Sequence, residues 1–338
     1  MDYIYRINLG SKIGLGHFTR IKYLIKNLKI KNYKIIIDKK PKLEFLHLKQ
    51  LKVHYLYEKN NSFKDEKTDA KKFLKYFNKN STVIVDDYRL GYNWEKVVRS
   101  HCSKLICIDD FLNKKHYSDI YINTKPELAN FNQGDMNQLK SLNKKNCKFL
   151  LGPKFSMINP DLKKITKKKS KFSITFYNGG SGKLGIYKEI IKALNKSLTK
   201  NFIINIIIGP FCMDGNKIIL DFKKYKNIKF FKSLNNLSSA LSNTDLLISS
   251  AGIILYEAAY FKIPTILIQM NKNQETLAED LQKIGHYFFL DKKEIKDTNK
   301  FKNLILSMYK NYKNIKTLIK NPSIKVGSSK NILIKSIR

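Results

Sequence analysis

The feature of this sequence that most constrains its fold is the regular alternation of short apolar runs with amphipathic stretches. The apolar runs are rich in β-branched residues and bounded by turn residues, which is typical of strands in a parallel sheet covered on both faces. The stretches between them carry apolar residues at i, i+3 and i+4, the spacing of a helix with one buried face. We therefore predict an α/β protein with doubly wound parallel sheets.

The alternation divides into two series, which predict two Rossmann-like domains, residues 1–158 and 159–338, facing across a cleft. The predicted strands of the first series cover residues 3–7, 34–37, 53–57, 82–86, 105–109, 119–123 and 149–151. Those of the second cover residues 172–177, 202–209, 228–231, 245–249, 264–270 and 287–290. Helices are predicted near residues 17–28, 184–198, 217–224, 235–241, 255–261 and 274–283. We expect a polar loop over 123–148, a link over 161–171, and one or two closing helices with a basic end after Asp297.

Composition narrows the class of protein. No apolar run reaches the roughly 18 residues of a membrane span, and Met1–Arg6 continues directly into a strand pattern without a signal peptide, so we expect a cytoplasmic protein. The four cysteines form no C-x-x-C pair, and no histidine stands beside them at metal spacing, so we expect buried free thiols. We expect no cofactor and no metal. We also expect a monomer, although the sequence leaves the oligomeric state open.

The formal net charge is +38, from 65 basic and 27 acidic residues. Such a charge is typical of nucleic-acid or anionic-membrane binders. However, nearly all the basic residues are lysines spread along the chain, whereas nucleic-acid recognition relies on clustered arginine forks. We interpret the charge as lysine-rich solvated faces and expect no specific nucleic-acid partner. A binder of nucleic acid or an anionic surface remains an alternative, and the positive field would also attract a diphosphate.

The first candidate site is the glycine-rich turn after the first predicted strand, over residues 10–20. Gly14 and Gly16 allow positive φ and a close approach of the backbone to a ligand. His17 stands at the start of the following helix, where the helix dipole disfavours imidazolium, so we expect a neutral ring that can act as a general base. Arg20 lies one helical turn later and is a candidate for substrate binding. A plain turn with an incidental histidine is the alternative. The spacing is not G-x-G-x-x-G, which argues against a dinucleotide cofactor.

The second candidate is the turn between the strand at 172–177 and the next helix. Gly179, Gly180 and Ser181 place small residues and a hydroxyl before a helix N-terminus, which suits a diphosphate. No G-K-[ST] follows, so the turn is not a Walker loop. A plain strand–helix turn is the alternative.

The third candidate follows the strand at 245–249. Ser250 and Gly252 precede a helix that carries Glu257 among apolar residues, and ribose hydroxyls could partner this carboxylate. An exposed helical glutamate is the alternative. Asn273 and Gln274, at the next predicted helix start, are candidate substrate contacts, although capping explains them equally well.

Aspartate pairs end two strands of the first series, at residues 86–87 and 109–110, and Tyr88 follows the first pair. They either line a sugar pocket or cap helices. The chain has no Asp-x-Asp, which argues against a transferase that holds its nucleotide-sugar through a metal ion.

Together these segments resemble the UDP-2,4-diacetamido-2,4,6-trideoxy-β-L-altropyranose hydrolases of pseudaminic acid biosynthesis. More distantly, they are similar to the peptidoglycan N-acetylglucosaminyl transferases, which share the GT-B arrangement of two Rossmann-like domains. The resemblance covers roughly residues 4–290 and rests on the order and spacing of several motifs. These are residues 13–20, 85–88, 108–110, 151–155, 179–181, 249–258 and 273–274.

The resemblance implies inverting hydrolysis of a UDP-sugar at its anomeric carbon, without a metal. It assigns the general base to His17, a sugar contact to Tyr88, the ribose contact to Glu257, and the diphosphate turn to Gly180 and Ser181. The chain departs from the family pattern at four places and so leaves the sugar substituents open. These are Asn8, Asn159, Asn178 and the segment Thr124–Lys125. A glycosyltransferase of the same fold, in which His17 deprotonates a sugar hydroxyl, is the alternative activity.

Overall fold

The structure, a computed structural model, describes residues 2–10, 13–41, 48, 51–58, 61–163, 171–180, 182, 184–197, 202–232, 237–268, 278–285, 288–290, 294–319 and 322–338. These residues form two compact units. The first unit contains Met1–Ile13, His17–Pro160 and Gly327–Arg338, and the second contains Gly14–Gly16 and Asp161–Val326.

The first unit is built on a seven-stranded sheet in the order β3-β2-β1-β4-β5-β6-β7, and every neighbouring pair is parallel. Its strands are β1 (Tyr3–Ile7), β2 (Tyr33–Ile37), β3 (Val53–Tyr55), β4 (Thr82–Asp86), β5 (Lys104–Ile108), β6 (Ile120–Asn123) and β7 (Lys148–Leu151). Its helices are α1 (Gly16–Leu28), α2 (Glu66–Phe73), α3 (Tyr92–Arg99), α4 (Gln133–Ser141) and α12 (Lys330–Ile337), with the 3₁₀ turns η1 (Leu74–Tyr76), η2 (Pro126–Asn130) and η3 (Pro153–Phe155).

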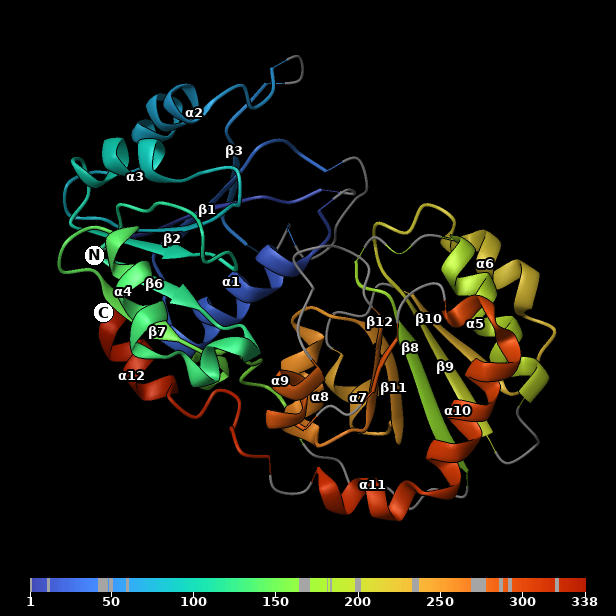
Figure 1. Ribbon diagram of the computed structural model, residues 1–338. Helices are drawn as coiled ribbons and strands as arrows, with labels where there is room; N and C mark the ends of the chain where they lie inside the picture. Colours follow the sequence, from blue (N-terminus) through green and yellow to red (C-terminus); the bar gives the residue numbers. More distant parts are fainter. Residues whose placement is uncertain are drawn as a thin grey trace. The chain divides into compact units, whose positions relative to one another are not determined.

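Helices α2 and α3 lie together over one face of this sheet (Figure 1). Phe73 of α2 and Trp94 of α3 are fully buried and pack on alternate strand residues such as Val83 and Leu105. Successive strand residues point to opposite faces, so Asp86 of β4 points away from the face that Val83 and Val85 share with these helices.

The second unit holds a six-stranded parallel sheet in the order β10-β9-β8-β11-β12-β13. Its strands are β8 (Phe172–Tyr177), β9 (Phe202–Ile208), β10 (Ile228–Lys232), β11 (Leu246–Ser250), β12 (Thr265–Ile268) and β13 (Phe288–Leu290). Its helices are α5 (Leu184–Ser197), α6 (Gly215–Phe222), α7 (Ser238–Leu241), α8 (Ile254–Phe261), α9 (Ala278–Lys283), α10 (Thr298–Lys310) and α11 (Tyr312–Leu318), with the 3₁₀ turn η5 (Glu294–Lys296). Helices α5, α6 and α10 cover one face, and α7 and α8 cover the other (Figure 1).

Both sheets reverse their strand order at one point, between β1 and β4 in the first unit and between β8 and β11 in the second. Ligands of open α/β sheets bind beyond the carboxyl ends of the strands at such a switch point. The register brings the two strand ends level, because Ile7 pairs with Asp86 and Tyr177 pairs with Ser249. The predicted fold class is therefore confirmed, with the predicted turns at both switch points.

The polar segment 123–148 was wrongly predicted to be a loop, since it contains η2 and the nine-residue helix α4. Within α4 only Leu139 is buried, so the apolar periodicity that identifies helices is missing. A local signal was nevertheless present. Asn132 and Asp135 form a capping box, in which each side chain accepts a hydrogen bond from the backbone N–H of the other.

The end of the chain also differs from the prediction, because the structure describes three helices after Asp297 and the last, α12, belongs to the first unit. Lys104 Nζ donates to the carbonyl oxygens of Ser336 and Ile337 at 3.3 and 3.2 Å, and Arg338 donates to that of Leu28 at 2.9 Å. Residues 327–338 therefore complete the domain that the sequence placed entirely within residues 1–158. None of the described helices is both long enough and apolar enough to cross a membrane.

Candidate functional site

The glycine turn after β1 leads into α1 in the way the sequence predicts. Gly14 has φ +83°, a backbone conformation that favours glycine. A Cβ on Gly16 would meet no atom within 4 Å, so the start of α1 is sterically open there. Because α1 begins at Gly16, the next residue, His17, lies in its first turn. The His17 side chain contacts Asp86 at the end of β4.

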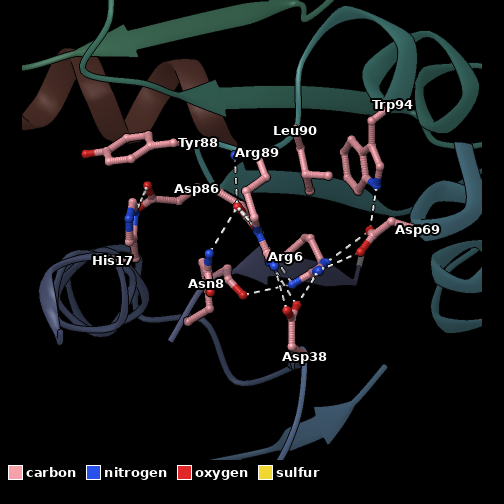
Figure 2. Close-up of polar contacts among 12 residues, drawn as sticks. Arg6, Asn8, His17, Asp38, Asp69, Asp86, Tyr88, Arg89, Leu90 and Trp94 are labelled. Carbon is pink, nitrogen blue, oxygen red and sulfur yellow. Dashed lines mark hydrogen bonds and ion pairs between the residues drawn. The ribbon is translucent and has the colours of Figure 1, made fainter. Parts of the chain in front are cut away.

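His17 contacts a carboxylate that the sequence did not assign to it. Its Nδ1 lies 2.6 Å from Oδ1 of Asp86, the last residue of β4, and the Asp86 side chain is completely buried (Figure 2). The imidazole keeps 7% of its surface exposed. Its ring meets that of Tyr88 edge to face, with 4.5 Å between centroids.

Arg20 binds the same carboxylate with two nitrogens. Its Nε donates to Asp86 Oδ2 at 2.8 Å and its Nη2 to Asp86 Oδ1 at 2.5 Å, while Nη1 donates to Asp110 at 2.9 Å. The Tyr88 hydroxyl also donates to Asp110. The structure thus brings His17, Arg20 and Tyr88 into one cluster with two aspartates. The three guanidinium nitrogens of Arg20 all bond to these carboxylates. The contact of Arg20 with substrate stays a prediction.

The electrostatics of the cluster follow from these contacts. Burial alone would raise the pKa of Asp86, but the adjacent Arg20 guanidinium and His17 ring outweigh it and hold that pKa below its ordinary value. Burial, and then the Asp110 carboxylate, raise the pKa of Tyr88 well above its usual range. The Asp86 side chain is therefore an anion that only accepts hydrogen bonds, and the Tyr88 phenol keeps its proton and donates.

A second charged network lies at the carboxyl end of the same sheet and was not predicted. Arg6 of β1 is fully buried and donates to Asp69 of α2 and to Asp38 (Figure 2). Arg89 bridges Asp38 and Asp87 with bonds of 2.6 to 2.9 Å. A lone arginine in an apolar strand was the available signal, since such a charge needs a partner.

A third cluster surrounds His116, on the loop after β5. Its Nδ1 lies 2.7 Å from Glu95 and its Nε2 2.9 Å from Asp109, and Cys107 Sγ lies 3.3 Å from Nδ1. The ligand atoms of Glu95, Cys107 and His116 are close enough together to hold a metal ion. However, both ring nitrogens already face carboxylates. Burial opposes protonation, but the bonds to Asp109 and Glu95 raise the pKa of His116 to about 9.

The fold brings His116 against Cys107, a contact that the prediction about metal spacing in the sequence did not address. His116 and Cys107 are nine residues apart in sequence, a separation at which no metal motif would be sought.

In the second unit, the turn after β8 is built for close approach of the backbone. Gly179 has φ +69°, and a Cβ placed there would lie 3.7 Å from the hydroxyl of Ser250. Two of the predicted segments, the turns after β8 and β11, therefore lie close together. A Cβ on Gly209, after β9, would lie 2.3 Å from the carbonyl oxygen of Gly179 and 2.5 Å from that of Gly180. Gly209 therefore supports the turn, although the sequence did not indicate this role.

The turn after β11 contributes the other predicted residues. A Cβ on Gly252 would meet no atom within 4 Å, so the approach to α8 is open. Glu257 of α8 is 1% exposed, so the alternative of an exposed glutamate is wrong. Burial and then the charge of Glu257 raise the pKa of Tyr177 at the end of β8. Ser181, Asn273 and Gln274 lie outside the described residues.

The chain is similar in sequence to known proteins. Residues 174–333 match the glycosyltransferase family 28 C-terminal domain. Over 221 residues the chain is 27% identical to the uncharacterized protein MJ1062 of Methanocaldococcus jannaschii, a match that covers 61% of this chain and 44% of that protein, less than half its length. Over 295 residues it is 24% identical to the UDP-2,4-diacetamido-2,4,6-trideoxy-β-L-altropyranose hydrolase of Campylobacter jejuni, covering 85% of this chain and 98% of that protein.

Two solved structures share the fold at low sequence identity. The chain is similar to Acinetobacter baumannii MurG, with a TM-score of 0.59 and 10% identity over 100% of this chain and 99% of that one. It is also similar to the UDP-GlcNAc 2-epimerase of Neisseria meningitidis bound to UDP-GlcNAc, with a TM-score of 0.61 and 12% identity over 99% of each chain. The two parallel-sheet α/β domains therefore have the GT-B type of fold.

Proposed function

We propose that this protein acts on a UDP-sugar and hydrolyses a UDP-linked diacetamido-trideoxy sugar to UDP and free sugar, a step in nonulosonic (pseudaminic) acid biosynthesis. The observation that carries the proposal is the contact of His17 with Asp86 at the switch point of the first sheet. The match to the Campylobacter jejuni hydrolase over 85% of the chain supports the choice of substrate class.

In this proposal His17 is the general base. Water attacks the anomeric carbon and gives its proton to the imidazole. The bond between that carbon and the diphosphate oxygen breaks, and the electron pair leaves with UDP. The step uses no metal or cofactor. Gly14 and Gly16 would let the substrate approach the backbone beside His17, and Tyr88 would contact the sugar.

The second unit would bind the nucleotide. Gly179, Gly180 and Ser181 would receive the diphosphate, because backbone N–H groups before α5 stabilise the negative charge that develops on the leaving group. Ser250 and Gly252 would contact the nucleotide beside them, and the buried Glu257 would accept hydrogen bonds from the ribose. Asn273 and Gln274 would complete the substrate contacts.

The test is to incubate the purified protein with the UDP-sugar, in EDTA and without an acceptor, and to quantify UDP and free sugar. We expect release of both, and we expect His17→Gln to lower kcat by roughly 10²–10⁴-fold, the usual contribution of a general base. His101→Gln is the matched control, because His101 is exposed and bonds only its own helix end and Ser100 among the described contacts. Full activity of His17→Gln would exclude this residue as the base.

A glycosyltransferase is the second candidate, favoured by the match of residues 174–333 to a glycosyltransferase domain. His17 would then take the proton of an acceptor hydroxyl. Release of UDP only when an acceptor sugar is added would establish this activity. Binding to duplex DNA that weakens steeply with salt, without affinity for UDP, would instead support the charge-driven binder.

A further inference from the structure

The Asp86 carboxylate has an unusual set of neighbours for a residue at the end of a strand. Its two oxygens face three nitrogens, Nδ1 of His17 and both Nε and Nη2 of Arg20. All three lie within 2.8 Å, and the aspartate side chain has no exposed surface. Both oxygens therefore bond to these two side chains, and solvent has no access to them.

These contacts define which atom carries the proton between His17 and Asp86. The guanidinium of Arg20 is charged at any working pH and can only donate. Despite burial, Arg20 and His17 keep the pKa of Asp86 below its ordinary value, so this side chain is ionised and can only accept. Nδ1 of His17 must therefore be the donor in the 2.6 Å bond.

We propose that Asp86 is a positioning residue that holds His17 in the tautomer protonated on Nδ1, so that Nε2 carries the lone pair. The inference rests on the proposed function, because it explains how His17 is prepared to act as the base. A neutral imidazole can accept a proton only on its unprotonated nitrogen, and the bond made by the other nitrogen decides which one that is. Asp86 supplies that bond from a fixed strand end.

Arg20 extends the same arrangement. Its two bonds to Asp86 fix the plane of the carboxylate, since a bidentate pair leaves little rotational freedom. Its third bond reaches Asp110, which accepts the Tyr88 hydroxyl, and the Tyr88 ring packs edge to face on His17. Among the described residues, the charged or titratable groups around the imidazole are therefore Asp86 at the end of β4, Arg20 of α1, and Tyr88 with Asp110 behind it.

The first test needs no substrate. ¹⁵N-histidine labelling and long-range proton–nitrogen correlation spectra separate the two neutral tautomers of each ring. The six histidines are assigned by difference, with His17→Gln identifying the relevant signal. At a pH where the titration shows His17 to be neutral, we expect its Nδ1 to be protonated and its Nε2 to be bare. A wild-type ring protonated on Nε2 would overturn the proposal.

The second test uses Asp86→Asn, which keeps the shape of the side chain. Its amide has one acceptor oxygen, which cannot serve both Arg20 Nε and His17 Nδ1, so the tautomer should no longer be fixed. We expect a mixed or inverted tautomer and a loss in kcat of roughly 10²–10⁴-fold, with KM changed far less. Asp110→Asn is the control for the spectrum. It removes the same charge from Arg20 and should keep the Nδ1-protonated ring.

The outcomes separate this proposal from the proposed function. An Nδ1-protonated ring in a protein that releases no UDP would refute the function and retain the role of Asp86. If the protein turns over substrate and the His17 ring of Asp86→Asn has the same tautomer as in the wild type, the function is retained and the role of Asp86 is refuted. Trp94 fluorescence verifies that each variant is folded, because Trp94 is fully buried in the first unit.

Discussion

Among single side chains, buried Arg6 shows how an apolar-looking strand can carry a charge. Its Nε and Nη2 donate to Asp69 at 3.2 and 2.6 Å, and the hydroxyl of Tyr57 and Nε1 of Trp94 each donate to Asp69 at 2.8 Å. Burial opposes the charge of Arg6, but its aspartate neighbours raise its pKa above the ordinary value. A buried ion pair of this kind is costly to break, because one charge is then left without compensation.

Asp69→Ala should therefore destabilise the first unit by about 3–5 kcal/mol. The measurement is urea unfolding followed by fluorescence of Trp94, the single tryptophan of the chain, which reports on this unit alone. The matched control is Asp65→Ala at the N-cap of the same helix, where an exposed aspartate accepts a hydrogen bond from the backbone N–H of Thr68. Equal losses in the two variants would show that Arg6 finds other partners.

For the secondary-structure elements, the sequence located the thirteen strands that the structure describes to within a few residues, because a buried parallel strand is a compact apolar run. It missed α4, whose exposed faces hide the helical period. It also missed the support that one element gives another. Gly209 at the end of β9 lies against the turn after β8, a contact between segments that no local pattern encodes.

Gly209→Ala should displace that turn, because the added Cβ would overlap the carbonyl oxygens of Gly179 and Gly180. We expect the second unit to lose about 1–3 kcal/mol, the usual cost of overpacking, and the affinity for UDP to fall. Far-UV circular dichroism and calorimetric titration with UDP measure the two effects. Gly185→Ala in α5 is the control, since its Cβ would meet nothing within 4 Å. Unchanged UDP affinity in Gly209→Ala would separate the turn from nucleotide binding.

Across the molecule, the net charge of +38 conceals local clusters in which acidic groups surround arginine or histidine. In the first unit, Asp86 and Asp110 bind Arg20, and Glu95 and Asp109 bind His116. The lysine-rich composition therefore says little about the chemistry of these buried groups. The free energy of unfolding of the first unit should nevertheless depend on pH, because these groups gain or lose protons.

His116 should make the first unit less stable as pH rises from about 6.5 to about 9. Between these values the folded protein holds a proton on His116 that the unfolded chain releases, so unfolding becomes easier with increasing pH. The contribution is complete below the unfolded pKa and amounts to about 3 kcal/mol at most. Urea unfolding monitored through Trp94 at several pH values, compared with His116→Gln, measures it. Equal pH slopes in the two proteins would refute this role.

Local order along the chain was enough to predict two parallel α/β sheets and the turns at their switch points, because strands, helices and glycine turns follow from neighbouring residues. The partners within the site could not be predicted in this way. Arg6 and Asp69 are 63 residues apart, and His17 and Asp86 are 69 apart. Aspartates at strand ends have similar local sequences whether they cap a helix, neutralise an arginine or orient a histidine. Only folding, which brings the carboxyl ends of separate strands together at one end of the sheet, selects among these roles.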